Sequence, residues 1–267
     1  MDSWLNVLRC IVCSVLVLGM LCCAREMPDT LSALGDSLLQ EERFDDALAA
    51  YTRAIDSFPD HIPAYLGRAK LHRVRGRYEH STRDYIRAVE LGDSSFETFM
   101  GLGRLYLEMD LSEEARKYLK QAHEMRPDDA LICRDIADAY CSDSMTELAM
   151  KWYGRCIDRD PQNADAYVGR GKALGRHRMF DLALADFTYA ISINPKNADA
   201  RHYRGYTYFS MGVYKPAIHD FIETLDIDPD CPKSRFYMAW SLRELGYNEV
   251  AIVELERFLA EHGDHGT

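Results

Sequence analysis

The sequence predicts an all-α solenoid of seven antiparallel helix pairs, and two observations carry this prediction. A pattern of small, large and proline residues recurs every 34 residues from residue 28 to residue 265, without a gap. Inside each copy, apolar residues recur at helical spacing in two separate stretches. One pair of short helices cannot bury its own apolar face, but stacked pairs share a continuous core.

Four positions of the repeat define the two helices. The copies start at residues 28, 62, 96, 130, 164, 198 and 232. Position 8 is always small: Gly35, Ala69, Gly103, Ala137, Gly171, Gly205 and Ala239. Position 20 is also always small: Ala47, Ser81, Ala115, Ala149, Ala183, Ala217 and Ala251. Position 24 is always large: Tyr51, Tyr85, Leu119, Tyr153, Phe187, Phe221 and Leu255. Small residues at positions 8 and 20 let the two helices approach closely, and the residue at position 24 fills the adjoining layer. A proline at position 32 of five copies ends the second helix.

This spacing resembles the tetratricopeptide repeat (TPR), and the resemblance covers the chain from residue 28 to residue 265. The aromatic residue of the family's first helix appears as Tyr65, Phe99 and Tyr167, whereas Cys133 takes its place in the fourth copy. The resemblance implies a right-handed superhelix of seven TPR units. It also implies a protein or peptide partner, held in a concave groove that the first helices line.

A second pattern links the two helices of a repeat. Arginine stands at position 7 only in the copies that have aspartate at position 23. The expected pairs are Arg68 with Asp84, Arg170 with Asp186, and Arg204 with Asp220. We interpret them as structural ion pairs between the first and second helix.

Residues 1–27 stand apart from the repeats. The fifteen residues from Cys10 to Ala24 contain no charge. They resemble a secretory signal peptide, which has a weakly basic start, an apolar stretch of about 7–15 residues and small residues at its end. We therefore predict a signal peptide or membrane anchor and a location at the cell envelope, exported and in contact with the membrane through this segment.

The fate of this leader is open at the level of sequence. Cleavage after Ala24 fits the small residues at Cys22 and Ala24. Alternatively, Cys22 or Cys23 is the lipidated cysteine of a bacterial lipoprotein, although the residues before each match that motif poorly. An uncleaved anchor needs about 20 apolar residues, and Asn6 and Arg9 interrupt the stretch of that length. A cytosolic protein with a buried first helix is the remaining alternative.

The candidate partner-binding residues are aromatic. By the 100° step of a helix, positions 6 and 9 of each first helix lie opposite its core face, and in the TPR family they line the groove. The last two copies carry rings there: Tyr203, Tyr206, Tyr237 and Trp240. Earlier copies carry small or charged residues, so we expect a groove that is open and polar first and aromatic near its C-terminal end. The alternative is that these rings pack between first helices and stiffen the stack.

Several other functions lack support in the sequence. The net charge of −11 disfavours nucleic acid as a partner, because phosphate binding needs an excess of basic residues. The chain has no nucleophile, metal or phosphate-loop motif, so we predict no catalysis, cofactor or metal. His262 and His265 near Asp264 are read as a solvated terminus. The chaperone-tail clamp of the TPR family needs asparagine at positions 6 and 9, and no copy has it.

Two features of the repeats remain. Cys133 and Cys156 fall at core positions and are expected to be small apolar residues, with a disulfide between them as the alternative in an exported protein. The last predicted helix, near Glu249 to Glu261, has an apolar edge at Ile252 and Leu259 that nothing covers, which suggests self-association.

The function predicted from the sequence is a non-enzymatic scaffold at the cell envelope. It resembles, at the level of the family, bacterial envelope TPR lipoproteins that assist the assembly of pili, secretins or outer-membrane complexes. The alternatives are a signal-anchored adaptor that faces the cytosol and a regulatory subunit of an enzyme complex.

Overall fold

The structure is a computed structural model that describes residues 27–262. These residues form fourteen α-helices and no strand. The chain divides into two compact units, Met1–Leu105 and Tyr106–Thr267. Cys22, Cys23, Asp264 and His265 lie outside the described residues, so the predictions made for them remain predictions.

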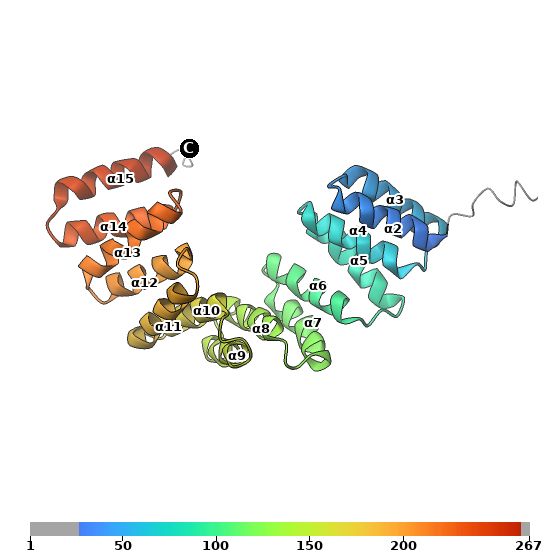
Figure 1. The fold of residues 1–267 in the computed structure, drawn as a ribbon, viewed down its shortest axis with the longest axis horizontal. Coiled ribbons are helices and arrows are strands. Elements are labelled where there is room, and N and C mark those ends of the chain that lie inside the picture. Colours follow the sequence, from blue (N-terminus) through green and yellow to red (C-terminus); the bar gives the residue numbers. More distant parts are fainter. Residues whose placement is uncertain (1–26, 263–267) are drawn as a thin grey trace, which may run out of the picture. The chain divides into compact units, whose positions relative to one another are not determined.

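Unit 1 contains two complete helix pairs and most of a further helix (Figure 1). Its helices are α2 (Pro28–Gln40), α3 (Phe44–Ser57), α4 (Ile62–Val74), α5 (Tyr78–Glu90) and the greater part of α6 (Phe96–Glu108). In unit 1, α2 packs against α3, α4 packs against α5, and α3 packs against α4.

Unit 2 continues the same alternation (Figure 1). Its helices after α6 are α7 (Ser112–Met125), α8 (Ala130–Ser142), α9 (Thr146–Arg159), α10 (Ala164–Arg176), α11 (Phe180–Ile193), α12 (Ala198–Ser210), α13 (Tyr214–Ile227), α14 (Pro232–Glu244) and α15 (Asn248–His262). Sequential helices from α7 to α15 pack against one another, and so do successive first helices from α8 to α14. The predicted all-α TPR fold is confirmed.

The small residues at positions 8 and 20 make room for the ring at position 24. The residue at position 20 is at most 3% exposed in all seven copies. A Cβ added at Gly35 would lie 2.5 Å from Cε1 of Tyr51, and one added at Gly171 would lie 2.7 Å from Cε1 of Phe187. Both rings are almost completely buried. In these two repeats the core is therefore one large ring pressed against the backbone of the first helix.

The turn inside each repeat has one backbone geometry throughout. Position 15 has a positive φ in all seven copies: Glu42, Gly76, Asp110, Ser144, Arg178, Gly212 and Gly246. The backbone N–H of position 16 donates to the carbonyl five residues earlier; that of Met145, for example, donates to the carbonyl of Tyr140 at 2.9 Å. This is the Schellman arrangement, which satisfies carbonyl groups at the end of the first helix.

The three predicted arginine–aspartate pairs are confirmed. In each pair, Nε and one terminal nitrogen of the arginine donate to the two aspartate oxygens, at distances of 2.7–2.8 Å. The aspartate side chains are between 3% and 9% exposed. Two parallel bonds fix both helices at once, and removing the arginine would leave a buried carboxylate without its cation.

We expect Arg170→Ala to lower the free energy of unfolding by about 2–4 kcal/mol, because Asp186 would stay buried and charged. The coupling between the two residues is measured by chemical denaturation of Arg170→Ala, Asp186→Ala and the double variant. Arg43→Ala is the control, since Arg43 and Asp46 form a pair in which both side chains are more than half exposed, and it should change stability little. Strict additivity of the two single changes would contradict the structural role.

Candidate partner-binding surface

Positions 2, 6, 9 and 13 of α8, α10, α12 and α14 form the first-helix surface of unit 2. These helices lie side by side, because each contacts the next first helix along the chain. All four predicted binding rings belong to this surface. They divide into two kinds: Tyr203 and Tyr237 at position 6 are half-buried, whereas Tyr206 and Trp240 at position 9 are 39% and 38% exposed.

The two half-buried rings rest on the core of the preceding repeat. Tyr203 stacks on Phe187 with ring centroids 6.2 Å apart, and Tyr237 stacks on Phe221 at the same distance. Tyr237 also contacts Tyr206, at 4.9 Å between centroids. Packing and exposure therefore coexist here: the position 6 rings stiffen the stack, and the position 9 rings remain available.

The glycines at position 6, where the sequence predicts an open groove, lie directly against core rings. A Cβ at Gly67 would lie 2.3 Å from the ring of Tyr51, and one at Gly169 would lie 2.4 Å from the ring of Tyr153. Each tyrosine belongs to the preceding repeat and fills the space that its glycine leaves. A pattern in the sequence marks this relation but was missed: glycine follows a tyrosine at position 24 sixteen residues later in every case, at Gly67, Gly101 and Gly169.

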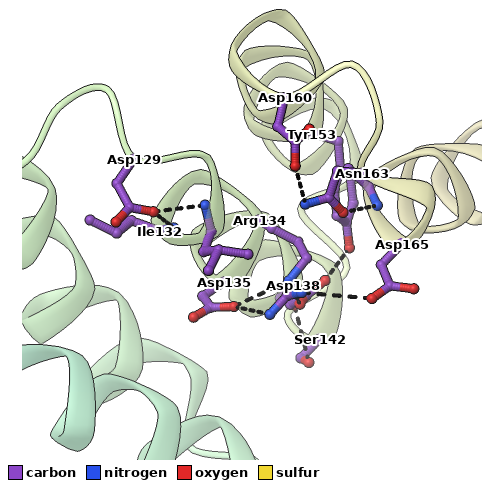
Figure 2. A network of polar contacts seen from close by, with 12 residues as sticks. Asp129, Ile132, Arg134, Asp135, Asp138, Ser142, Tyr153, Asp160, Asn163 and Asp165 are labelled. Carbon is purple, nitrogen blue, oxygen red and sulfur yellow. Dashed lines mark hydrogen bonds and ion pairs between the residues drawn. The ribbon is translucent and has the colours of Figure 1, made fainter.

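An acidic network surrounds Arg134 of α8, at the α8 end of this surface (Figure 2). Arg134 donates to Asp135 at 2.8 Å and lies 3.9 Å from Asp138 and 3.7 Å from Asp165. The hydroxyl of Tyr153 also donates to Asp138. Burial raises the pKa of Asp138, while the bond from Tyr153 and the charge of Arg134 oppose that shift. Three carboxylates around one guanidinium leave this region acidic.

A cavity of about 460 Å³ lies beside this network, among α10, α11 and α12. Its apolar wall includes Phe180, Phe187 and Tyr203. Its basic groups are Lys172, whose Nζ lies 4.5 Å from the centroid of the Tyr203 ring, and Arg176. A cavity with an aromatic wall and two cations suits an apolar side chain next to a carboxylate.

His202, Cys133 and Cys156 are buried and serve packing. His202 is 7% exposed, its Nδ1 lies 2.7 Å from Oγ of Ser234, and burial lowers its pKa to about 4. Cys133 and Cys156 are free, fully buried thiols, as the core interpretation predicts. Burial raises the pKa of Cys156 to about 12, which keeps it as an unreactive thiol.

Neither a metal cluster nor a membrane-spanning helix is found within residues 27–262. Ile252 and Leu259 on α15 are 55% and 60% exposed. This exposure is compatible with the predicted self-association, which remains a prediction.

Comparisons with known proteins agree with this fold. Residues 32–95 and 96–129 match family models described as tetratricopeptide repeat, so TPR repeats are confirmed. A segment of 64 residues, 24% of this chain, is 38% identical to the "Protein CTR9 homolog" of Arabidopsis thaliana. That segment spans 6% of the plant protein.

Three solved structures illustrate the structural similarity. The structure of the APC/C hetero-tetramer Cut9–Hcn1 matches 82% of this chain and 44% of its own, with TM-score 0.65 and 17% identity. Pseudomonas aeruginosa pilF matches over 79% and 96%, with TM-score 0.65 and 14% identity. YrrB, described as a TPR protein with an unusual peptide-binding site, matches over 69% and 95%, with TM-score 0.54 and 23% identity. At these identities the similarity shows the fold.

The buried His202 predicts a loss of stability in acid. Its folded pKa of about 4 lies below the unfolded value near 6.5, so the unfolded chain binds more protons between these values. The free energy of unfolding should therefore fall by about 2–3 kcal/mol from this group as pH drops from 6.5 to 4. Denaturation of wild type and His202→Gln across this range measures the difference. His219→Gln, at an exposed position on α13, is the control, and equal pH slopes for wild type and His202→Gln would contradict the assignment.

Proposed function

We propose that this protein is a non-enzymatic scaffold that binds an extended peptide segment of a partner on the first-helix surface of unit 2. The TPR fold supports a role in protein–protein interaction. The bound segment carries an acidic residue next to a large apolar residue. The apolar side chain enters the cavity among α10, α11 and α12, and the carboxylate faces Lys172 and Arg176.

The observation that carries this proposal is Gly175, which lines the cavity near the end of α10. A glycine inside a helix is less stable than alanine by about 1 kcal/mol. Gly171 has a packing reason, because Phe187 occupies the space of its Cβ, but a Cβ at Gly175 would meet no atom within 4 Å. The missing side chain keeps the cavity open, and a peptide would use that space.

The exposed rings extend the surface beyond the cavity. Tyr206 lines the cavity itself, and Trp240 lies on the next first helix with the Cζ of Arg243 4.8 Å from its ring centroid. We assign these two side chains to peptide contact, Tyr203 to the wall of the cavity, and Tyr237 to the support beneath Tyr206. A rigid aromatic surface loses little side-chain entropy on binding, so it concentrates binding energy.

Filling the cavity should separate stability from binding. Peptides of twelve residues are selected on the wild-type protein by phage display, and the Kd of the enriched peptides is then measured by fluorescence anisotropy. We expect enrichment of Asp or Glu beside Phe, Leu or Tyr. Gly175→Leu should keep or raise the thermal midpoint and weaken binding by at least about tenfold. Lys172→Glu should weaken the same peptides without a change in helical content.

The matched control is Gly154→Leu on α9. Gly154 is also a helical glycine whose Cβ would meet nothing within 4 Å, and it does not line the cavity. The Gly154→Leu variant should be stabilised like Gly175→Leu and should bind the enriched peptides like the wild type. Enriched peptides that bind Gly175→Leu as tightly as the wild type would rule out the cavity as the site.

We further propose that the protein is exported and tethered at the cell envelope by residues 1–27. The uncharged segment from Cys10 to Ala24 supports this proposal. The rival is an uncleaved anchor that leaves the repeats facing the cytosol.

The mass of the intact protein extracted from its native membrane distinguishes these outcomes. If the protein is tethered, we expect a chain that starts at Cys22 or Cys23 and carries added acyl mass. Such a lipid would hold the first repeat near the bilayer. A start at Arg25 would contradict the tether and leave an exported soluble scaffold. Retention of Met1 would favour the uncleaved anchor, and protease accessibility in intact cells would then show which side the repeats face.

A further inference from the structure

One edge of unit 2 carries a row of exposed apolar side chains. They stand at repeat position 16, directly after the turn between the two helices: Leu111, Met145, Met179, Val213 and Tyr247. Their exposed fractions run from 39% to 55%. We call these five residues the turn-edge row. The row shares no residue with the first-helix surface, which consists of positions 2, 6, 9 and 13.

A second set of apolar side chains widens the row. Position 19 holds Leu148, Leu182 and Val250, which are 42%, 58% and 50% exposed. Both positions are apolar in the fourth, fifth and seventh repeats. Met145 with Leu148 and Met179 with Leu182 stand at the start of α9 and α11. Both of these helices pack against α10. An exposed apolar surface of this extent is typical of an interaction site.

The fold does not require apolar residues at these positions. In unit 1 the same two positions hold Arg43 and Asp46, which form an exposed ion pair at 2.7 Å, and then Arg77 and His80. The backbone hydrogen bonds of the turn are the same in these repeats. A residue after a Schellman turn often contacts the preceding helix, but that contact leaves about half of each side chain of the row exposed. Position 16 is also the N-cap of the second helix, where an apolar residue supplies no hydrogen bond.

Charges beside the row indicate what would cover it. Position 18 holds exposed carboxylates in four of the five repeats: Glu113, Glu147, Asp181 and Glu249. Lys215 is the exception at this position. Other cations of this edge are Arg178, with its Cζ 5.9 Å from the centroid of the Phe180 ring, and Lys117 and Lys151 at position 22. An anionic lipid surface, or the same row of a second copy, would bring like charges together.

We propose that the turn-edge row of unit 2 binds a basic amphipathic helix of a partner protein. The apolar face of that helix covers the row, and its lysines or arginines face the carboxylates at position 18. Apolar contact supplies affinity and the opposite charges fix the orientation. The row shares no residue with the lining of the peptide cavity, although Met179 directly precedes Phe180 of that lining.

The test uses two synthetic helices and the full chain. One peptide of eighteen residues consists of leucine and lysine, with the leucines at spacings of three and four, and its counterpart has glutamate in place of lysine. Fluorescence anisotropy should show saturable binding of the lysine peptide only. The variant Met179→Ser/Leu182→Ser should raise its Kd by at least about tenfold. Glu147→Lys/Asp181→Lys should weaken the lysine peptide and gain binding of the glutamate peptide.

The control variant is Met125→Ser/Ile222→Ser, which removes two apolar side chains that are 48% and 46% exposed away from the row. It should bind the lysine peptide like the wild type. Circular dichroism and the thermal midpoint check the folding of every variant. Because all the substituted residues are exposed, and the charge variant leaves the row intact, loss of folding in one variant leaves the other as the test.

Four results would overturn the proposal. The first is equal binding of the lysine peptide by the wild type and both turn-edge variants, and the second is equal binding of the two peptides by the wild type. The third is row-dependent binding to phosphatidylcholine vesicles without peptide binding, which would identify a lipid surface. The fourth is a row-dependent dimer in sedimentation without peptide binding, which would identify a second copy. Gly175→Leu leaves the row unchanged, so failure of either proposed site is distinguishable from failure of the other.

Discussion

The ring at repeat position 24 packs against both helices that flank it. It sets the distance between the two helices of its own repeat, and it limits which residue the next repeat can place against the ring. Tyr51 lies so close to Gly35 of its own repeat and Gly67 of the next that a Cβ at either glycine would come within 2.5 Å of the ring. Where phenylalanine stands at this position, the next repeat instead places a ring on it, Tyr203 on Phe187 and Tyr237 on Phe221. In this chain a tyrosine at position 24 is thus followed by a glycine at position 6 of the next repeat, and a phenylalanine is followed by an aromatic ring.

This constraint shapes the first-helix surface of unit 2. Position 6 is a boundary position, because its side chain serves the repeat interface before it serves a partner. In the last two repeats the side chain at position 9 is not required for packing between repeats. Tyr206 and Trp240 stand there and are exposed. The cavity beside Tyr206 has a similar origin. Its α10 side includes glycines, which have no side chain to fill it, and aromatic rings line its other sides. A surface of this kind derives its rigidity from the core and its chemistry from a few positions that the core leaves free.

The sequence predicts the repeat well because the information is redundant. Seven copies repeat each packing relation, so the helix pairs and even the pairing of Arg170 with Asp186 follow from comparing copies. Relations between neighbouring copies are harder to see. The dependence of Gly169 on Tyr153 spans sixteen residues across a repeat boundary, and aligning the copies position by position hides it. The cavity depends on the directions of several side chains, and exposure at the turn edge depends on how much of each side chain the preceding helix covers. Neither quantity is contained in a hydrophobic pattern.

The turn inside the repeat shows how such a scaffold acquires a second surface without changing its fold. At position 16 the backbone N–H is satisfied by the carbonyl five residues earlier, whatever side chain the residue carries. Arg77 and Met179 therefore occupy equivalent backbone sites while presenting a cation in one unit and an apolar group in the other. Because stability comes from the ring at position 24 and from the ion pairs, substitutions at the turn edge are nearly independent of the core. The side chain at position 16 can therefore change from one copy to another while the backbone of the turn stays the same.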